Sequence, residues 1–332
     1  MKVDRPPRCS PSEPEITAVA VIPFNTELRV GEINHRGKPQ VTEEIDQSEG
    51  VILRRGVVVD WDAYESAWSS AMYRNQSIAN ANVVVLSEAP LTPLAQRERT
   101  VSILFGMFEA CAVLVAVDAV LALRAFTWAE HTAIVLSSTD QITHAVPIVD
   151  GIIVPHAIVC QDLGKEDFVR SLYASDDCEP LFRPVATLTQ ATDIDVGDGP
   201  AIAKAAAAEE DSDNYLGMHQ IVCKAISRCQ SDEIRTTLFG RIFLVGSTTS
   251  IGNFKERLES EVTELVPEGT RVSVYSEYGT KSLPYVGACA LHLAASEAVL
   301  AHAFTRAQFM AEGVTGVHGH VLGISFELLD TT

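Results

Sequence analysis

The amino-acid sequence predicts an α/β protein with two lobes. Short runs of β-branched and apolar residues alternate along it with amphipathic stretches, a pattern that indicates largely buried sheets covered by helices. The chain has 332 residues, of which 47% are hydrophobic, and this is enough to form two cores.

The predicted strands are short and continuously apolar, as expected of strands buried on both faces. In chain order they are residues 18–22 (A-V-A-V-I), 57–59 (V-V-V), 83–86 (V-V-V-L), 133–136 (A-I-V-L) and 242–245 (I-F-L-V). The longer stretches between and after them have the mixed apolar and polar character of surface helices. The predicted helices are residues 62–73, 94–109, 113–124 and 290–310.

Charge and composition limit the classes of partner. The formal net charge is −19 and no run of basic residues offsets it, so nucleic acid and anionic membranes are disfavoured and protein partners are expected. No window offers the ~20 uncharged apolar residues of a membrane span, and the first residues lack the apolar stretch of a secretory signal. We therefore expect a cytosolic or nuclear protein. Its seven cysteines form no C-x-x-C pair and are expected to be reduced.

Two segments are expected to lie outside the folded core. Residues 1–14 contain four prolines among alternating charges and predict a disordered tail. Residues 185–214 are loose and acidic, and they predict an inserted surface segment.

Residues 134–148 predict a strand pair around a polar turn. Two apolar runs, 134–136 and 145–148, flank five small polar residues, S-S-T-D-Q at 137–141. A hairpin that holds phosphate normally needs glycine where its backbone approaches the ligand, and this turn has none. A role other than phosphate binding is indicated.

Several stretches together resemble actin and the actin-related proteins. Residues 55–62 (R-G-V-V-V-D-W-D) are similar to H-G-I-V-x-N-W-D, and residues 86–93 (L-S-E-A-P-L-T-P), followed by Arg97-Glu98, are similar to L-T-E-A-P-L-N-P followed by R-E. Further matches lie at 143–148, 180–184, 244–249 and 285–288. The resemblance covers roughly residues 16–310, and it implies an actin-like fold with two ribonuclease-H-type lobes.

The resemblance also implies the limits of the lobes. Lobe one would comprise residues 15–127 and 284–332, and lobe two residues 128–283. Little chain separates Gly31 from Arg55, and Cys178-Glu179 runs almost directly into the motif at 180–184, so the outer subdomains two and four of actin look truncated. Because those subdomains form one face of the filament contact, the resemblance implies a chain that does not polymerise with itself.

The nucleotide site that the family uses looks degenerate. In the first phosphate hairpin, actin's aspartate and two glycines become Ile22, Phe24 and Thr26, and in the second, D-S-G-D-G becomes S-S-T-D-Q. Asp118 stands in place of the glutamine that orients water. These changes imply a pseudo-ATPase with no cofactor, no metal and no catalytic residue; the alternative is an actin-like protein that still binds ATP with magnesium. The matching remnants are Thr26, Arg29, Asp140, Gly246, Thr248 and Lys281.

The resemblance implies a structural subunit of a larger cytoskeletal assembly, either a motor adaptor or a ciliary axoneme complex. The location would be the cytoplasm and cytoskeleton, including a cilium or flagellum, and the alternative is a nuclear subunit of a chromatin-remodelling complex. A partner helix would lie in the groove between the lobes. The residues expected to line that groove are Leu121, Arg124, Leu291, Ala294 and Leu300. Of the histidines, His144 and His156 are expected in the core, and His318-Gly319-His320 in a loop that binds no metal.

Overall fold

The computed structural model describes most of the chain as two compact units. The described residues are 18–21, 28–33, 39–45, 52–74, 83–126, 131–168, 178–184, 215–276, 283–294 and 302–323. Unit 1 comprises residues 1–129 and 282–332, and unit 2 comprises residues 130–281. These divisions fall within two residues of the predicted lobe limits at 127/128 and 283/284. The predicted tail at 1–14 and the acidic segment at 185–214 lie outside the described residues.

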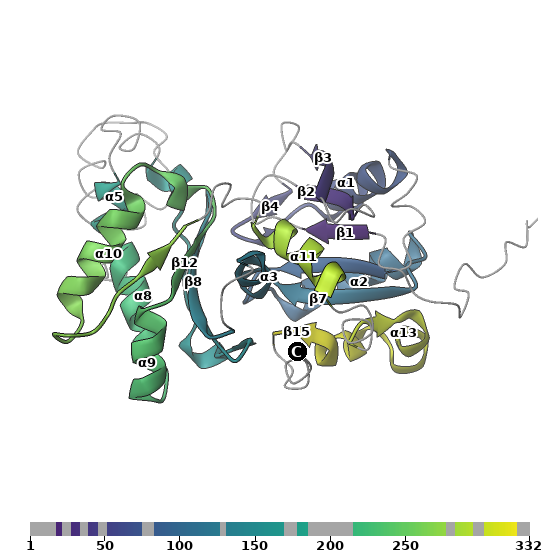
Figure 1. Cartoon of the computed structure of the whole chain (residues 1–332). Helices are drawn as coiled ribbons and strands as arrows, with labels where there is room; N and C mark the ends of the chain where they lie inside the picture. The colour runs from purple at the N-terminus through teal and green to yellow at the C-terminus, as the bar shows by residue number, and fades with distance from the viewer. Residues whose placement is uncertain are drawn as a thin grey trace, which may run out of the picture. The chain divides into compact units, whose positions relative to one another are not determined.

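Unit 1 is built on one sheet with the strand order β14-β7-β6-β1-β2-β3, and β15 also pairs with β7 (Figure 1). Strands β1, β2 and β3 form an antiparallel meander, while β1, β6 and β7 run parallel. The strands of this sheet are β1 (Ala18–Val21), β2 (Leu28–Ile33), β3 (Pro39–Ile45), β6 (Val83–Glu88), β7 (Ala112–Val117), β14 (Phe304–Thr305) and β15 (Val321–Leu322).

Unit 2 repeats this topology. Its sheet has the order β10-β9-β8-β12-β13, with β11 also beside β9. Antiparallel pairs join β8, β9 and β10, whereas β8, β12 and β13 run parallel. The strands are β8 (Ala133–Ser138), β9 (Thr143–Val149), β10 (Ile152–Ile153), β11 (Val159–Gln161), β12 (Ile242–Val245) and β13 (Val274–Tyr275). A three-strand meander followed by two parallel strands therefore occurs in each unit, as a duplicated ribonuclease-H-type fold requires.

Helices connect the parallel strands and cover the sheets. Unit 1 contains α1 (Trp61–Arg74), α2 (Leu94–Gly106), α3 (Asp118–Ala125), α11 (Leu283–Ala294), α13 (Arg306–Glu312), the 3₁₀ helix η7 (Val314–His320) and a small hairpin, β4 (Leu53–Arg54) with β5 (Val57–Val58). Unit 2 contains α5 (Glu179–Phe182), α8 (Met218–Ser227), α9 (Asp232–Phe239), α10 (Phe254–Leu265) and the 3₁₀ helices η2 (Pro155–Ala157), η3 (Lys165–Phe168) and η5 (Thr248–Ser250).

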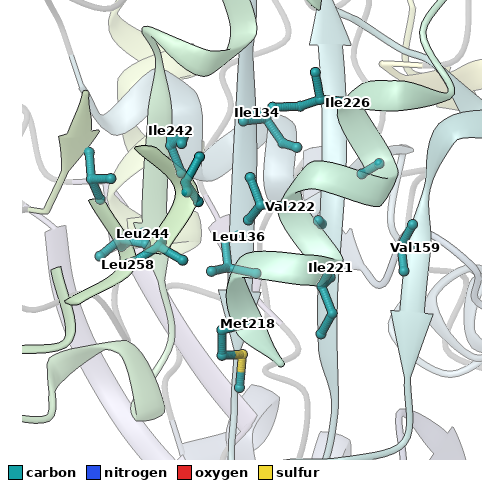
Figure 2. Packing of buried hydrophobic residues seen from close by; sticks show 14 of the residues in the cluster. Ile134, Leu136, Val159, Met218, Ile221, Val222, Ile226, Ile242, Leu244 and Leu258 are labelled. Carbon is teal, nitrogen blue, oxygen red and sulfur yellow. The ribbon is translucent and has the colours of Figure 1, made fainter. Parts of the chain in front are cut away.

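The core of unit 2 shows why the sequence forms these elements. Along α8, apolar residues recur at the spacing of one helical face, and that face packs on the strands of the sheet (Figure 2). The buried residues labelled there are Ile134, Leu136, Val159, Met218, Ile221, Val222, Ile226, Ile242, Leu244 and Leu258.

Two helix predictions were wrong in extent. Residues 113–124 were predicted as one helix, but 113–117 belong to strand β7 and only α3 is helical. A fully buried apolar run has no polar face, so its periodicity does not distinguish a strand from a helix. The helix predicted at 290–310 begins earlier, at Leu283, and residues 304–305 form strand β14.

The helices α3 and α11 approach each other closely. A Cβ atom on Gly287 would overlap the backbone carbonyl of Leu121, so only glycine permits this contact. Leu121, Tyr285 and Ala288 are all buried in the cluster between the sheet and the two helices. The buried apolar faces of both helices therefore belong to the core of unit 1.

The cysteines and one histidine depart from expectation. Cys160, Cys178, Cys223 and Cys229 are free thiols, but Cys111 is disulfide-bonded. Separation along the sequence does not reveal which sulfur atoms meet in space, so this bond was not predictable. His156 was expected in the core, yet it is exposed on the short turn of η2. Among the described residues, no helix has the length and apolar character needed to cross a membrane.

Candidate functional site

The candidate site of unit 2 lies where the carboxyl ends of two parallel strands meet. Strands β8 and β12 are neighbours, and Ser137 pairs with Val245 near their ends. The turn Ser137–Ile142 consists of the last two residues of β8 and the four residues after it, and the segment Gly246–Thr249 follows β12. In sheets of this kind, ligands bind outside the carboxyl ends of the strands, so these two segments are the place to look for a phosphate site.

The turn after β8 is closed by its own hydrogen bonds. The backbone N–H of Thr139 donates to the carbonyl of Ile142 at 3.0 Å, and the N–H of Ile142 faces the Thr139 hydroxyl at 3.4 Å. The Ser138 and Thr143 hydroxyls are 2.7 Å apart across the hairpin. Among residues 137–142, all of which the structure describes, none has a positive φ. A concave nest of N–H groups for an anion requires left-handed residues, and this turn lacks them.

The segment after β12 packs directly on that turn. Gly246 has φ +101°, and a Cβ atom there would overlap the carbonyl of Ser138, so both the conformation and the space require glycine. The Thr248 hydroxyl donates to the carbonyl oxygen of Thr139 at 2.7 Å, and the Ser247 hydroxyl donates to the Asp140 carboxylate at 2.7 Å.

A third segment holds the other side of the turn. The backbone N–H groups of Lys165 and Glu166 donate to the carbonyl oxygens of Thr139 and Asp140 at 3.1 and 2.8 Å. A Cβ atom on Gly164 would overlap the peptide group after Asp140. The turn is thus bonded to the chain on two sides, and Thr139 accepts a hydrogen bond from each.

The structure brings together half of the remnants predicted from the sequence. Asp140, Gly246 and Thr248 lie around one turn. Arg29 is in β2, and its backbone pairs with Val21 and Glu44. Thr26 and Lys281 lie outside the described residues. Ile22 and Phe24, the other first-hairpin positions at which the phosphate site is expected to be lost, also lie outside them.

The duplicated topology and the position of this turn agree with one family. The Actin family model matches residues 37–175 and 177–321. The chain belongs to the actin family. The predicted membership and the actin-like fold class are therefore confirmed.

Unit 1 contains a buried charge cluster that sequence analysis did not identify. Arg97 Nε donates to both carboxylate oxygens of Glu88, at 3.0 and 2.9 Å, and Arg97 Nη2 donates to one of them as well. Both side chains are buried. Burial raises the pKa of the Glu88 carboxyl, and the facing Arg97 guanidinium opposes this effect. Both residues are identified from the sequence only as parts of motifs. Glu88 ends a strand and Arg97 lies in a helix nine residues later, and this separation does not indicate that their side chains touch.

His318 extends this cluster to the C-terminal part of unit 1. Its Nδ1 lies 3.0 Å from Arg97 Nη1, and its Nε2 lies 2.8 Å from Glu98 Oε1. A guanidinium can only donate, so Nδ1 accepts and Nε2–H donates to the carboxylate. Residues 318–320 are in η7 rather than in a loop. Among the described residues, no group of three or more His, Cys, Asp or Glu side chains could hold a metal ion.

The predicted partner groove is only partly described. Leu121 has no exposed surface, so in this arrangement it is a core residue and cannot meet a partner. Arg124 is half-buried at the end of α3, and burial lowers its pKa. Leu291 and Ala294 are in α11, but their side chains lie outside the description, as does Leu300 entirely.

The position of Asp118 is also defined. The sequence resemblance predicts this residue in place of the family's water-orienting glutamine, and the structure buries it at the first position of α3, directly after β7. Its charge raises the pKa of Glu88, which ends the neighbouring strand β6. Two carboxyl groups therefore lie near the carboxyl ends of adjacent parallel strands in unit 1.

Proposed function

We propose that this actin-family chain is a non-catalytic structural subunit of a larger cytoskeletal assembly, such as a motor adaptor or a ciliary axoneme complex. The observation that carries the proposal is the turn Ser137–Ile142. It has neither a glycine nor a left-handed residue, and its Thr139 and Ile142 N–H groups are directed to partners within the turn. A phosphate chain needs several free N–H donors at this position.

Electrostatics support the same proposal. Asp140 is held at the turn by Ser247, and the whole chain has a net charge of −19. A triphosphate brought here would meet like charge unless a magnesium ion were also bound. The family's first acidic magnesium partner in this hairpin is replaced by Ser137.

Calorimetry with magnesium and ATP tests the loss of nucleotide binding. We expect no binding tighter than roughly millimolar, which corresponds to about 4 kcal/mol, while conventional actin in the same buffer provides the positive control. Micromolar affinity would support the alternative of an ATP-binding actin-like protein. Analysis of nucleotide released from the denatured purified chain gives an independent check, because a tightly held nucleotide would survive purification.

A second expectation is that the chain does not form filaments with itself. Only residues 46–52 connect β3 to β4, and residues 169–178 connect η3 to α5, so little chain is available for two outer subdomains at these two places. A polar filament needs two complementary faces on each subunit. Sedimentation after addition of salt, magnesium and ATP should leave the protein in the supernatant, and helical filaments seen by electron microscopy would contradict the proposal.

The proposed partner contact along α3 rests on Arg124. A half-buried cation at the last turn of α3 would favour a partner helix that carries carboxylates beside its apolar residues. Arg124→Gln removes the charge with little change in size, and we expect partner binding to weaken by about 1–3 kcal/mol at an unchanged melting temperature. Unchanged binding by the folded variant would place the interface elsewhere.

The assembly to which the chain belongs must be identified by an experiment in cells. Capture of the tagged chain with its partners, together with imaging of the same tag, distinguishes cytoskeletal complexes from the alternative of a nuclear remodelling complex. Recovery with motor or axonemal subunits supports the proposal. Recovery with remodelling subunits in the nucleus would replace it.

A further inference from the structure

Exposed apolar side chains occur in two segments of unit 1 that are hydrogen-bonded to each other. Among the described residues, seven large hydrophobic side chains are exposed, and four of them lie in or directly after the hairpin β4–β5, or at the start of α2 and just before it. Their exposed fractions are 42% for Val57, 53% for Val59, 59% for Leu91 and 57% for Leu94. Single exposed hydrophobic residues are ordinary, but a cluster indicates a binding surface.

The side chain of Gln96, near the start of α2, is hydrogen-bonded to the backbone of the hairpin. Val57 in β5 and Val59 directly after it are exposed, while Val58 between them is buried. The Gln96 side chain bonds to the edge of this strand twice: its Nε2 donates to the carbonyl of Gly56 at 3.1 Å, and its Oε1 accepts from the N–H of Val58 at 2.8 Å. The two bonds fix the position of the hairpin relative to the first turn of α2.

A small hollow lies between the two segments, and the buried Glu88 and Arg97 side chains also line it. Gly56 of the hairpin and Ala89, Thr92 and Gln96 of the second segment are among its lining residues, and its volume is about 30 Å³. That is room for roughly two water molecules, so the hollow could accept the tip of one small side chain but not a nucleotide. Leu91 and Leu94 lie on the same segment as Ala89 and Thr92.

The surface also carries a cation. Arg54 is directly opposite Val57 in the hairpin and is exposed, so the two side chains share the outer face. Within the part of the chain that the structure describes, Arg54 forms no ion pair. The chain as a whole has a net charge of −19, so an exposed positive charge beside apolar groups favours a partner that carries a carboxylate at this position. The hairpin patch is defined here as Arg54, Val57, Val59, Leu91 and Leu94.

We propose that the hairpin patch binds a short segment of a partner protein that presents at least two apolar side chains with a carboxylate beside them. The apolar side chains would cover the exposed valines and leucines, and the carboxylate would pair with Arg54. The inference deepens the proposed structural role and rests on it. It concerns a different surface from the end of α3.

Selection from a displayed library of random 12-residue peptides on the immobilised full chain provides a defined probe. The enriched peptides are expected to combine apolar residues with Asp or Glu. Synthetic copies, labelled for fluorescence anisotropy, should bind at least ~10-fold more weakly to Leu94→Lys and to Arg54→Glu, because each variant places an unfavourable charge at the contact. Met310→Lys is the matched control, since Met310 is a 76% exposed apolar residue on α13, outside the patch.

The same variants define the outcomes that would overturn the proposal. Equal binding of the peptides to all the variants, or enrichment of basic rather than acidic peptides, contradicts it. If sedimentation equilibrium shows a dimer that Leu94→Lys dissociates, the occupant is a second copy of the chain. Calorimetry with magnesium and ATP on the same preparations distinguishes a failure of the proposed structural role from a failure of the hairpin patch. Nucleotide binding would contradict the structural role, and it does not depend on the residues of the hairpin patch.

Discussion

Replacing Arg97 by methionine should strongly destabilise unit 1. The substitution keeps the length and apolar stem of the side chain but leaves the Glu88 carboxylate buried without its cation. Removing one partner of a buried ion pair typically costs about 3–5 kcal/mol. The carboxyl can avoid part of that cost by taking up a proton, and at pH 7 protonation of a group with an ordinary pKa near 4.3 costs about 3.7 kcal/mol. We therefore expect a loss of about 3–4 kcal/mol at pH 7.

The pH dependence follows from the same reasoning. In Arg97→Met, the pKa of Glu88 in the folded state lies above its value in the unfolded chain, so the folded state holds a proton that the unfolded state releases. The variant then loses stability as pH rises and recovers it as pH falls towards the unfolded pKa. Between pH 7 and pH 5.5 the difference from the native chain should shrink by up to about 2 kcal/mol, the full amount applying if Glu88 stays ionised in the native chain over this range, since burial raises the pKa of Glu88 there as well.

Urea unfolding followed by tryptophan fluorescence measures this effect, because Trp61 and Trp68 both lie on α1 of unit 1. Arg99→Met is the matched control: Arg99 is a more exposed arginine on the same helix, 3.3 Å from Glu65, and should cost less than about 1 kcal/mol. The double variant Glu88→Leu/Arg97→Met should recover most of the loss. A loss below 1 kcal/mol, or one that does not change with pH, would refute the assignment of a buried pair.

Two further substitutions test the close contacts. Gly287→Ala should destabilise unit 1 by about 1–3 kcal/mol or more, measured by thermal unfolding, because its methyl group would overlap the Leu121 carbonyl, whereas Gly106→Ala has free space and should be neutral or slightly stabilising. Thr248→Val removes the hydroxyl that donates to Thr139 and should cost about 1 kcal/mol in urea unfolding followed by circular dichroism; no loss would show that this bond is dispensable.

The sequence predicted the hairpin β8–β9 well and predicted helix α3 poorly, for identifiable reasons. In the hairpin, two apolar runs are separated by small polar residues, so both the strands and the turn have local signals. Residues 112–125 are buried almost throughout, and no polar face marks the change from strand to helix at Asp118. The family resemblance gave the duplicated topology, since no local pattern fixes which strands pair.

The contacts between distant segments could not be predicted from local patterns. The Glu88–Arg97–His318 cluster joins a strand, a helix and a 3₁₀ helix near the C-terminus, and the contact of Leu121 with Gly287 joins helices from opposite ends of unit 1. The same limitation explains why Leu121 was assigned to a partner surface. An apolar residue on a helix has the same sequence pattern whether it faces a partner or the core.

Under the proposed function, the turn Ser137–Ile142 corresponds to a phosphate hairpin that has become a structural turn. Polar backbone groups at the end of a buried strand pair need hydrogen-bond partners, and in a binding site the ligand or water supplies some of them. Here the donors come from Lys165, Glu166 and Thr248. If the family has glycines at these positions, as the resemblance implies, residues with a Cβ also reduce the number of conformations that the unfolded chain can adopt at this point. Our proposal therefore implies that the turn contributes to the stability of unit 2 without any nucleotide. The loss of unfolding free energy caused by Thr248→Val should then be the same with and without added magnesium and ATP.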